Sequence, residues 1–477
     1  MRKSIVLFTF ILLTLIFFGT RLVHKAAANA ASDDLVVKGS LTAAETLYVV
    51  KESGKVGINV ASPTQSLDVD GNINVIDGSY MQNGRVVLHT SPDNYGVFVG
   101  VEAGTANNED GLFNTFIGHQ AGRNTTSGSG LTAVGYQALY SNKSLNAGTA
   151  VGYQALFRSL IGGTAVGYQA LANNTSGEGN VAVGLQALYS NRTASNNVAI
   201  GYRALYSSRD DDGDNNIAIG YEAISAGDGG GGNIAIGTKA LRHTKGDNNI
   251  AIGTLAGYNI RYSNSDSNIA IGAWSLYAGA GARGNIAIGD GAMRQSVDGD
   301  NNTIIGYLAG FGAPNQSFSN NTFLGYLSGF SVSSGSNNVL IGYRSGQNLT
   351  TGSNNIIIGY DINALAPDIN NTLNIGNLIF GTNLDGTGKS VSSGNIGIGT
   401  QNPSHRLTVA GALCVDGSGG DECALQVIDA GSIWAKEVSG EKGIFSRLEL
   451  KDEETGTVYC IKIHNGELLA SPGSCKE

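Results

Sequence analysis

The sequence predicts an all-β protein built as a parallel β-solenoid with coils of about 17 residues, flanked by small β caps. Three observations lead to this fold class. A phrase close to "NNIAIG" returns between residues 96 and 376, 70 of the 477 residues are glycine, and only 6 are proline. A phrase that returns at a nearly fixed period is a structural unit, and a unit this short buries its apolar side chains only by stacking on its neighbours.

The chain opens with a segment typical of export. Arg2 and Lys3 precede an apolar run from Ile5 to Phe18, and small residues follow around Ala28. The run is shorter than the roughly 20 residues that a membrane-spanning helix needs. Arg21 and Lys25 lie between the run and the small residues, which leaves two alternatives open. We expect residues 1–30 to be a cleaved signal peptide or a retained N-terminal anchor, and the remainder to be secreted or at the cell surface.

The repeating phrase predicts the layout of one coil. Within "NNIAIG", Ile217 and Ile219 should lie on one face of a short strand and Ala218 on the other. Stacking of the coils should bury the isoleucines and leucines, and the segment "YEAI" after the closing glycine predicts a second short strand. We assign residues 31–95 to an N-terminal β cap and residues 96–395 to the β-roll repeat domain. The glycines that close the phrase are Gly118, Gly135, Gly152, Gly167, Gly184, Gly201, Gly220, Gly237, Gly253, Gly272, Gly289, Gly306, Gly325, Gly342 and Gly359.

The phrases "NNIAIGYEAI" at 215–224, "NNVAIGYRAL" at 196–205 and "GTAVGYQAL" at 163–171 resemble the head repeats of trimeric autotransporter adhesins. This resemblance implies a left-handed parallel β-roll, a homotrimer with three chains side by side, and adhesion to a host or neighbouring-cell surface. The small alanine within each phrase also suggests an apolar face that partner chains could cover.

Two stretches outside the repeats align with each other without a gap. They are "VGINVASPTQSLDVDG" at 56–71 and "IGIGTQNPSHRLTVAG" at 396–411. Both resemble a small β element that lies beside the shafts of phage tail fibres. Since a virion protein should not need an export signal, we interpret residues 396–411 as a shared building block.

The last residues, 412–477, predict a separate small β domain closed by disulfides. All four cysteines lie there, at Cys414, Cys423, Cys460 and Cys475, and an even, clustered set in an exported chain favours disulfides. The spacings do not fit the short ligand pairs of zinc. We favour the sequential bridges Cys414–Cys423 and Cys460–Cys475, with the two other connectivities open.

No catalytic or cofactor site is expected. The six histidines are scattered, and the formal charge of −9 without a basic stripe argues against nucleic acid. "GAGARG" at 279–284 and "NLDGTGKS" at 383–390 resemble phosphate-binding loops, but neither precedes an expected helix. Asp210, Asp212 and Asp214 alternate as in a calcium loop but lack its bidentate glutamate. We predict no enzyme activity, no cofactor and no metal.

Tyrosine follows the closing glycine in nine copies, so stacked coils should align the rings into a ladder. The rings then cover the glycine corner, form a binding stripe, or do both. We expect an exported adhesin-like rod that attaches to cells, matrix or glycans. The alternative is a structural surface filament without a foreign ligand. The nine residues are Tyr136, Tyr153, Tyr168, Tyr202, Tyr221, Tyr307, Tyr326, Tyr343 and Tyr360.

Overall fold

A computed structural model describes most of the repeat domain and several strands on either side of it. The described residues are 47–50, 55–58, 65, 67–69, 79–91, 95–144, 146–207, 213–227, 230–410, 426–427, 433–434, 448–451, 458–464 and 467–472. Contacts divide the chain into two units, residues 1–89 and residues 90–477. The described residues form strands and turns with no α-helix, so the predicted all-β class is confirmed. The predicted signal or anchor, residues 1–30, lies outside them.

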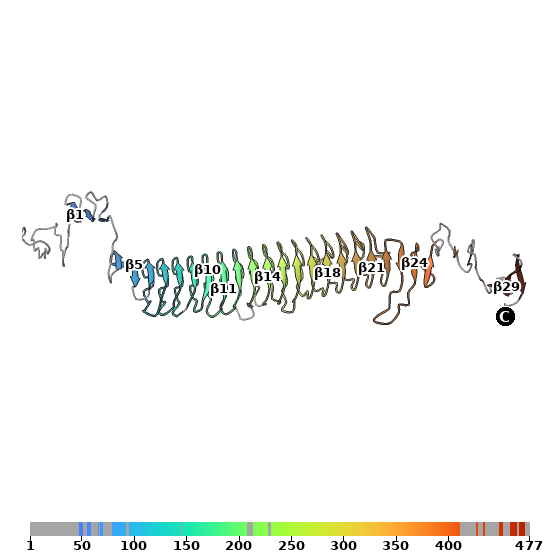
Figure 1. Cartoon of the computed structure of the whole chain (residues 1–477), viewed down its shortest axis with the longest axis horizontal. Helices are drawn as coiled ribbons and strands as arrows, with labels where there is room; N and C mark the ends of the chain where they lie inside the picture. Colours follow the sequence, from blue (N-terminus) through green and yellow to red (C-terminus); the bar gives the residue numbers. More distant parts are fainter. Residues whose placement is uncertain are drawn as a thin grey trace, which may run out of the picture. The chain divides into compact units, whose positions relative to one another are not determined.

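The repeat domain is one ladder of parallel strands that lie side by side (Figure 1). Sixteen consecutive parallel pairings join β6 to β22, which confirms the predicted solenoid. At about 4.8 Å per rung these sixteen steps extend roughly 77 Å. The strands are β6 (Gly96–Val99), β7 (Thr115–Ile117), β8 (Thr132–Val134), β9 (Thr149–Val151), β10 (Gly163–Val166), β11 (Asn180–Val183), β12 (Val198–Ile200), β13 (Ile217–Ile219), β14 (Ile234–Ile236), β15 (Ile250–Ile252), β16 (Ile269–Ile271), β17 (Ile286–Ile288), β18 (Thr303–Ile305), β19 (Thr322–Leu324), β20 (Val339–Ile341), β21 (Ile356–Ile358) and β22 (Leu373–Ile375).

Each coil contains one strand, so the expected second strand is wrong. The segment after the closing glycine is a series of turns. Its residues alternate into the left-handed region, as Gln137 and Leu139 show with φ values of 53° each. A strand needs extended backbone at every residue, and these angles exclude it.

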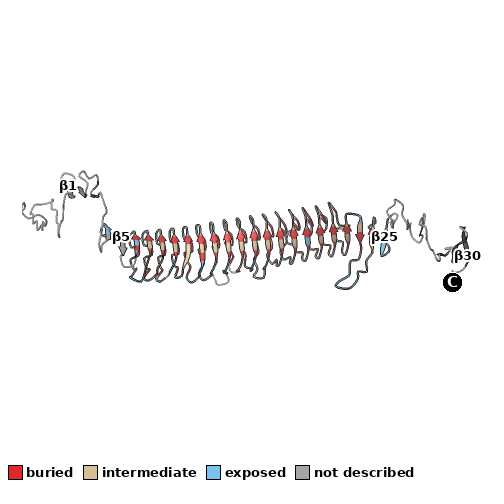
Figure 2. Ribbon diagram, in the orientation of Figure 1, coloured by how far each residue is buried: buried red, intermediate tan, exposed pale blue. Residues whose placement is uncertain are grey.

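The expected orientation of the strand is also wrong. Ala218 is fully buried, whereas Ile217 and Ile219 are only partly covered and point away from the interior. Figure 2 shows the same pattern of buried strand centres along the ladder. The alanine faces inward because the coil is narrow, and the opposite wall supplies the large side chain.

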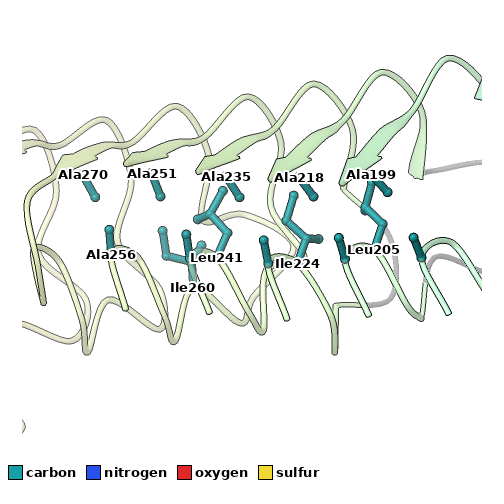
Figure 3. Packing of buried hydrophobic residues seen from close by; sticks show 14 of the residues in the cluster. Ala199, Leu205, Ala218, Ile224, Ala235, Leu241, Ala251, Ala256, Ile260 and Ala270 are labelled. Carbon is teal, nitrogen blue, oxygen red and sulfur yellow. The ribbon is translucent and has the colours of Figure 1, made fainter. Parts of the chain in front are cut away.

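In the central coils, two walls of the core face each other. Figure 3 shows the strand alanines Ala218 and Ala235 facing Ile224 and Leu241, which come from the turn segment. All four side chains are at most 3% exposed. Close packing of small against large residues in successive rungs gives one continuous apolar interior.

The "NN" dipeptide has two separate roles. The first asparagine of the pair, such as Asn337 with φ 60°, lies at the surface in the left-handed region that asparagine tolerates. The second, Asn338, is fully buried and accepts the backbone N–H of Asn355 at 3.0 Å. Its side-chain amide donates to the carbonyl of Gly352 at 2.9 Å. Equivalent buried asparagines extend this chain of bonds from Asn180 to Asn355.

The two tail-fibre-like stretches form the same small arrangement in their separate units. In unit 1, β1 (Leu47–Val50) is antiparallel to β2 (Lys55–Ile58), which is parallel to β3 (Leu67–Val69). In unit 2, β23 (Ile379–Gly381) is antiparallel to β24 (Ile396–Ile398), which is parallel to β25 (Leu407–Val409). Val56 pairs with Leu67 and Ile396 with Leu407, so the sequence offset is the same in both. The gapless alignment therefore reflects a structural duplication.

The C-terminal edge of the parallel ladder is covered. Strand β23 pairs antiparallel with β22, and the sheet continues through β24 to β25. The other described strands are antiparallel: β4 (Ser79–Gln82) with β5 (Arg85–Ser91), β26 (Gln426–Val427) with β27 (Ile433–Trp434), and β28 (Leu448–Lys451), β29 (Val458–His464) and β30 (Glu467–Pro472) in one sheet.

Candidate interaction surface

The outward side of the ladder is a largely apolar strip of side chains, which we call the strand face. It consists of the last residue of each strand from β6 to β22 and the residue two positions before it, which is threonine in β7, β8, β9, β10, β18 and β19 and valine, isoleucine or leucine in the other strands. The last residue is valine, isoleucine or leucine in every one of these strands, and none of them is buried. Ile236 and Ile252 are 37% and 38% exposed. An apolar strip this long exceeds what isolated soluble proteins usually leave in contact with water.

A glycine corner limits the strand face on one side. Gly237 has φ 134°, and a Cβ there would lie 2.6 Å from the carbonyl oxygen of Gly253 on the next coil. Only glycine fits this close approach of two backbones. The next residue of each coil points outward, and we call this position the corner column.

The corner column contains the nine tyrosines expected from the sequence, and they stack as predicted. Six pairs have ring centroids 4.9–5.4 Å apart and ring planes within 7–12° of parallel. The column is interrupted by Leu185 and by a longer gap at Thr238, Thr254, Ala273 and Asp290. Three separate tyrosine runs therefore exist, at 136–168, 202–221 and 307–360, in place of one continuous stripe.

Stacking decides which part of each ring a ligand could reach. Tyr153 lies between Tyr136 and Tyr168, so both of its ring faces are covered. Tyr153 is nevertheless 40% exposed. An inner tyrosine of a run thus presents its ring edge and hydroxyl group, and the open faces are confined to run ends such as Tyr360, which is 76% exposed.

A polar column follows the corner column. The side-chain amide of Gln137 donates to Gln120 at 2.7 Å, and the amide of Gln154 donates to Gln137 at 2.9 Å. At one end of this chain of hydrogen bonds, Arg203 donates to Gln186. At the other end, Gln120 donates to the carboxylate of Glu102. The full column is Glu102, Gln120, Gln137, Gln154, Gln169, Gln186 and Arg203. A charged group at each end suits the direction of these hydrogen bonds.

A second aromatic column, which was not predicted from the sequence, lies five residues after the corner glycine. Its stacked pairs are Tyr140 with Phe157, Tyr189 with Tyr206, Tyr258 with Tyr277, and Phe311 with Phe330. The signal was present in the phrases "GYQALY" and "GYQALF", in which an aromatic residue ends the turn segment.

Arginines lie against rings of both aromatic columns. The guanidinium of Arg203 lies 5.1 Å from the ring centroids of Tyr202 in the corner column and Tyr206 in the second column. The guanidinium of Arg294 lies 5.9 Å from Phe311 in the second column and 4.3 Å from Trp274, which belongs to neither column. Such cation–π contacts hold the arginines along the surface.

Two groups on this surface have shifted acid–base properties. The Glu222 carboxylate beside Tyr221 raises the pKa of that phenol, and Glu222 is itself paired with Arg242 at 3.2 Å. Burial lowers the pKa of His243, and the positive charge of Arg242 adds to this effect. Neither group belongs to a convergent acid–base pair.

The phosphate-loop candidates carry carboxylates where an anion would have to bind. A Cβ on Gly281 of "GAGARG" would lie 2.4 Å from a carboxylate oxygen of Asp298. In "NLDGTGKS", the Asp385 carboxylate accepts the backbone N–H of Ser393 at 2.5 Å and the hydroxyl of Ser392 at 3.1 Å. Bonds from Ser393 lower the pKa of Asp385, which keeps the negative charge in place. Neither loop is suited to a phosphate.

The remaining candidates fall partly or wholly outside the described residues. Of the alternating aspartates, Asp210 and Asp212 are not described, and Asp214 accepts the backbone N–H of Ser195 at 2.6 Å. The disulfide prediction also lies outside, since only the backbone of Cys460, in β29, is described.

Within the described ranges, no three His, Cys, Asp or Glu side chains converge as metal ligands. Over the same ranges, no helix is long and apolar enough to cross a membrane.

Comparisons with protein-family models, with curated proteins and with solved structures find no significant match to this chain. The parallel solenoid is compatible with the β-roll that the repeat phrases suggest. The adhesin family, the left-handed winding and the trimer stay predictions.

Proposed function

We propose that this chain is an exported, adhesin-like cell-surface rod that self-associates as a homotrimer through its strand face. The observation that carries the proposal is the unbroken column of valine, isoleucine and leucine at the last residue of every strand from β6 to β22. Large exposed apolar strips mark protein interfaces, and parallel copies of one chain offer each other strips of equal length and spacing. The resemblance of the repeats to trimeric adhesin heads supports the same arrangement.

The remaining surface of the rod is available for attachment to cells, matrix or glycans. The tyrosine runs and the arginine-flanked second aromatic column supply residue types that dominate binding hot spots. No nucleic-acid partner and no catalytic role is proposed, and contact with a membrane is limited to the possible N-terminal anchor. The C-terminal region, residues 412–477, is an alternative contact surface.

The alternative function is a structural surface filament without a foreign ligand. End-to-end stacking of rods would need free strand edges. Because β23 covers the edge of β22, the C-terminal end of the parallel ladder does not offer one. This arrangement favours the adhesin over the filament.

Sedimentation of the exported chain tests the assembly. We expect a trimer, and the paired substitution Ile236→Lys and Ile252→Lys should dissociate it without loss of β-structure. Thr238→Lys with Thr254→Lys is the matched control, since it adds the same charges to the same two coils beyond the glycine corner. A monomer for the unmodified chain would contradict the proposed trimer.

Binding tests the adhesive role separately. The purified chain should be retained by immobilised matrix proteins, glycans or whole cells. A chain lacking residues 412–477 distinguishes the rod from the C-terminal region as the contact surface. Assembly into long filaments without retention on any of these surfaces would favour the alternative function.

A further inference from the structure

The tyrosine runs have a geometry that suits covalent joining of neighbouring coils. We propose that they are modification sites at which a peroxidase-type one-electron oxidant with hydrogen peroxide links stacked tyrosines through dityrosine bonds within one chain. This proposal does not depend on adhesion.

The first run shows the required geometry. Tyr136 and Tyr153 have ring centroids 5.1 Å apart and 11° between ring planes, and Tyr153 and Tyr168 are 4.9 Å and 7°. Equivalent tyrosines of adjacent coils point the same way, so each ring places the carbons beside its hydroxyl next to those of its neighbour. Because the run is exposed at 40%, 40% and 47%, the ring edges are open to an oxidant and have room to tilt together.

The chemistry is balanced by one peroxide for each bond. Each tyrosine gives up one electron and its phenolic proton, which leaves a phenoxyl radical with unpaired spin on the two Cε carbons. Two such radicals on adjacent rings form a Cε–Cε bond, and the hydrogen on each bonded carbon then moves to the oxygen, which restores both phenols. The two hydrogen atoms removed reduce one hydrogen peroxide to two waters.

A link of this kind would fasten one coil to the next. Tyr136 and Tyr153 are 17 residues apart, and Tyr153 and Tyr168 are 15 apart. Closing loops of this size restricts the unfolded chain, as a disulfide does. A rod held together by rung-to-rung contacts thereby gains covalent staples along one edge.

The test is peptide mapping of the oxidised, full-length chain at low concentration. Cleavage after Arg123, Lys143, Arg158 and Arg192 puts each tyrosine of the run on its own peptide. We expect peptide 144–158 joined to 124–143 and to 159–192, with two hydrogens lost per link and dityrosine fluorescence. Fragmentation should place the bonds at Tyr136, Tyr153 and Tyr168, and no bond should join Tyr168 to Tyr202 across Leu185.

Two variants make the result specific. Tyr153→Phe keeps a stacked ring but has no hydroxyl, so both links should disappear. Tyr140→Phe is the matched control, because Tyr140 stacks at 5.2 Å on Phe157, which cannot form a phenoxyl radical. This control should leave the yield unchanged. The proposal would be overturned if no dityrosine formed, or if dityrosine bonds formed only between separate chains. It would also be overturned if the Tyr153→Phe variant gave as much dityrosine as the unmodified chain.

Discussion

The central coils and the coils near either end of the ladder fill the same interior position from opposite walls. In a central coil the strand contributes Ala235, and the large residue is Leu241, six positions later in the turn. Near the C-terminal end the strand contributes Phe323, and the position six residues later is Gly329. Both arrangements leave the interior fully buried.

Five of the six coils with a large buried residue at the strand centre have glycine six positions later, and the exception is Ile357, which is followed by Asn363. A Cβ on Gly329 would lie 2.7 Å from the Phe323 ring, and one on Gly346 would lie 2.8 Å from Leu340. At the N-terminal end, Gly122 would meet the Phe116 ring at 2.6 Å. In these coils a large residue at one of the two positions is matched by a small residue at the other, which maintains interior packing.

The largest expected effect comes from breaking this exchange in an end coil. Phe323→Ala removes a fully buried ring and should destabilise the rod by about 3–5 kcal/mol. Adding Gly329→Leu should restore most of that loss, since the central-coil pattern is then complete and Leu241 already tolerates φ 47° at this position. Denaturant unfolding of both variants measures the coupling, and strictly additive effects would contradict the exchange.

Substitution of a corner glycine should reduce the stability of the rod equally in central coils and in end coils. Gly237→Ala places a Cβ against the next coil at φ 134° and should destabilise by roughly 2–4 kcal/mol. The control is Gly130→Ala, where the nearest atom would be 3.9 Å away and Ala147 holds the same position at φ 56°. We expect about 1 kcal/mol there. Thermal unfolding compares them, and equal losses would show that the corner is not special.

The two asparagines of an "NN" pair allow a buried and an exposed position of the same coil to be compared. Asn338→Ala leaves the N–H of Asn355 and the carbonyl of Gly352 without their partner, so we expect a loss of about 2–3 kcal/mol. Asn337→Ala removes a surface bond to Asn354 and should lose at most about 1 kcal/mol. Unfolding midpoints decide between them, and the reverse order would refute the assigned roles.

The smallest expected effect is a pH dependence confined to a central coil. Burial lowers the pKa of His243 in the folded chain, whereas the pKa of this histidine in the unfolded chain is the ordinary value near 6.5. As the pH falls, the unfolded chain therefore binds a proton at His243 before the folded chain does. Stability should therefore fall as the pH drops below 6.5 and level off once the pH passes the folded-state pKa. Urea unfolding from pH 7.5 to 4.5 measures this slope, and His243→Gln should reduce it. An unchanged slope in that variant would assign the effect to another group.

Several features of the rod followed from the sequence alone. The period, the parallel stacking, the glycine corners and the stacked tyrosines were all predicted, because a repeat in register places each residue beside its own equivalent in the next coil. Tyr136 lies beside Tyr153 for this reason, independently of the rest of the fold. The repeat period predicts which residues form a column, but it does not predict whether a column faces the interior or the solvent.

Only the tertiary structure showed which face of each strand points toward the interior. Alternation in "IAI" separates Ala218 from Ile217 and Ile219, but both faces are apolar, so hydrophobicity did not identify the inner one. In most central coils the turn segment provides the large buried residue, such as Leu241, so the strand points its alanine inward. That choice also turned the isoleucines outward and created the strand face. The left-handed backbone angles in the turn segment mean that each coil has one strand.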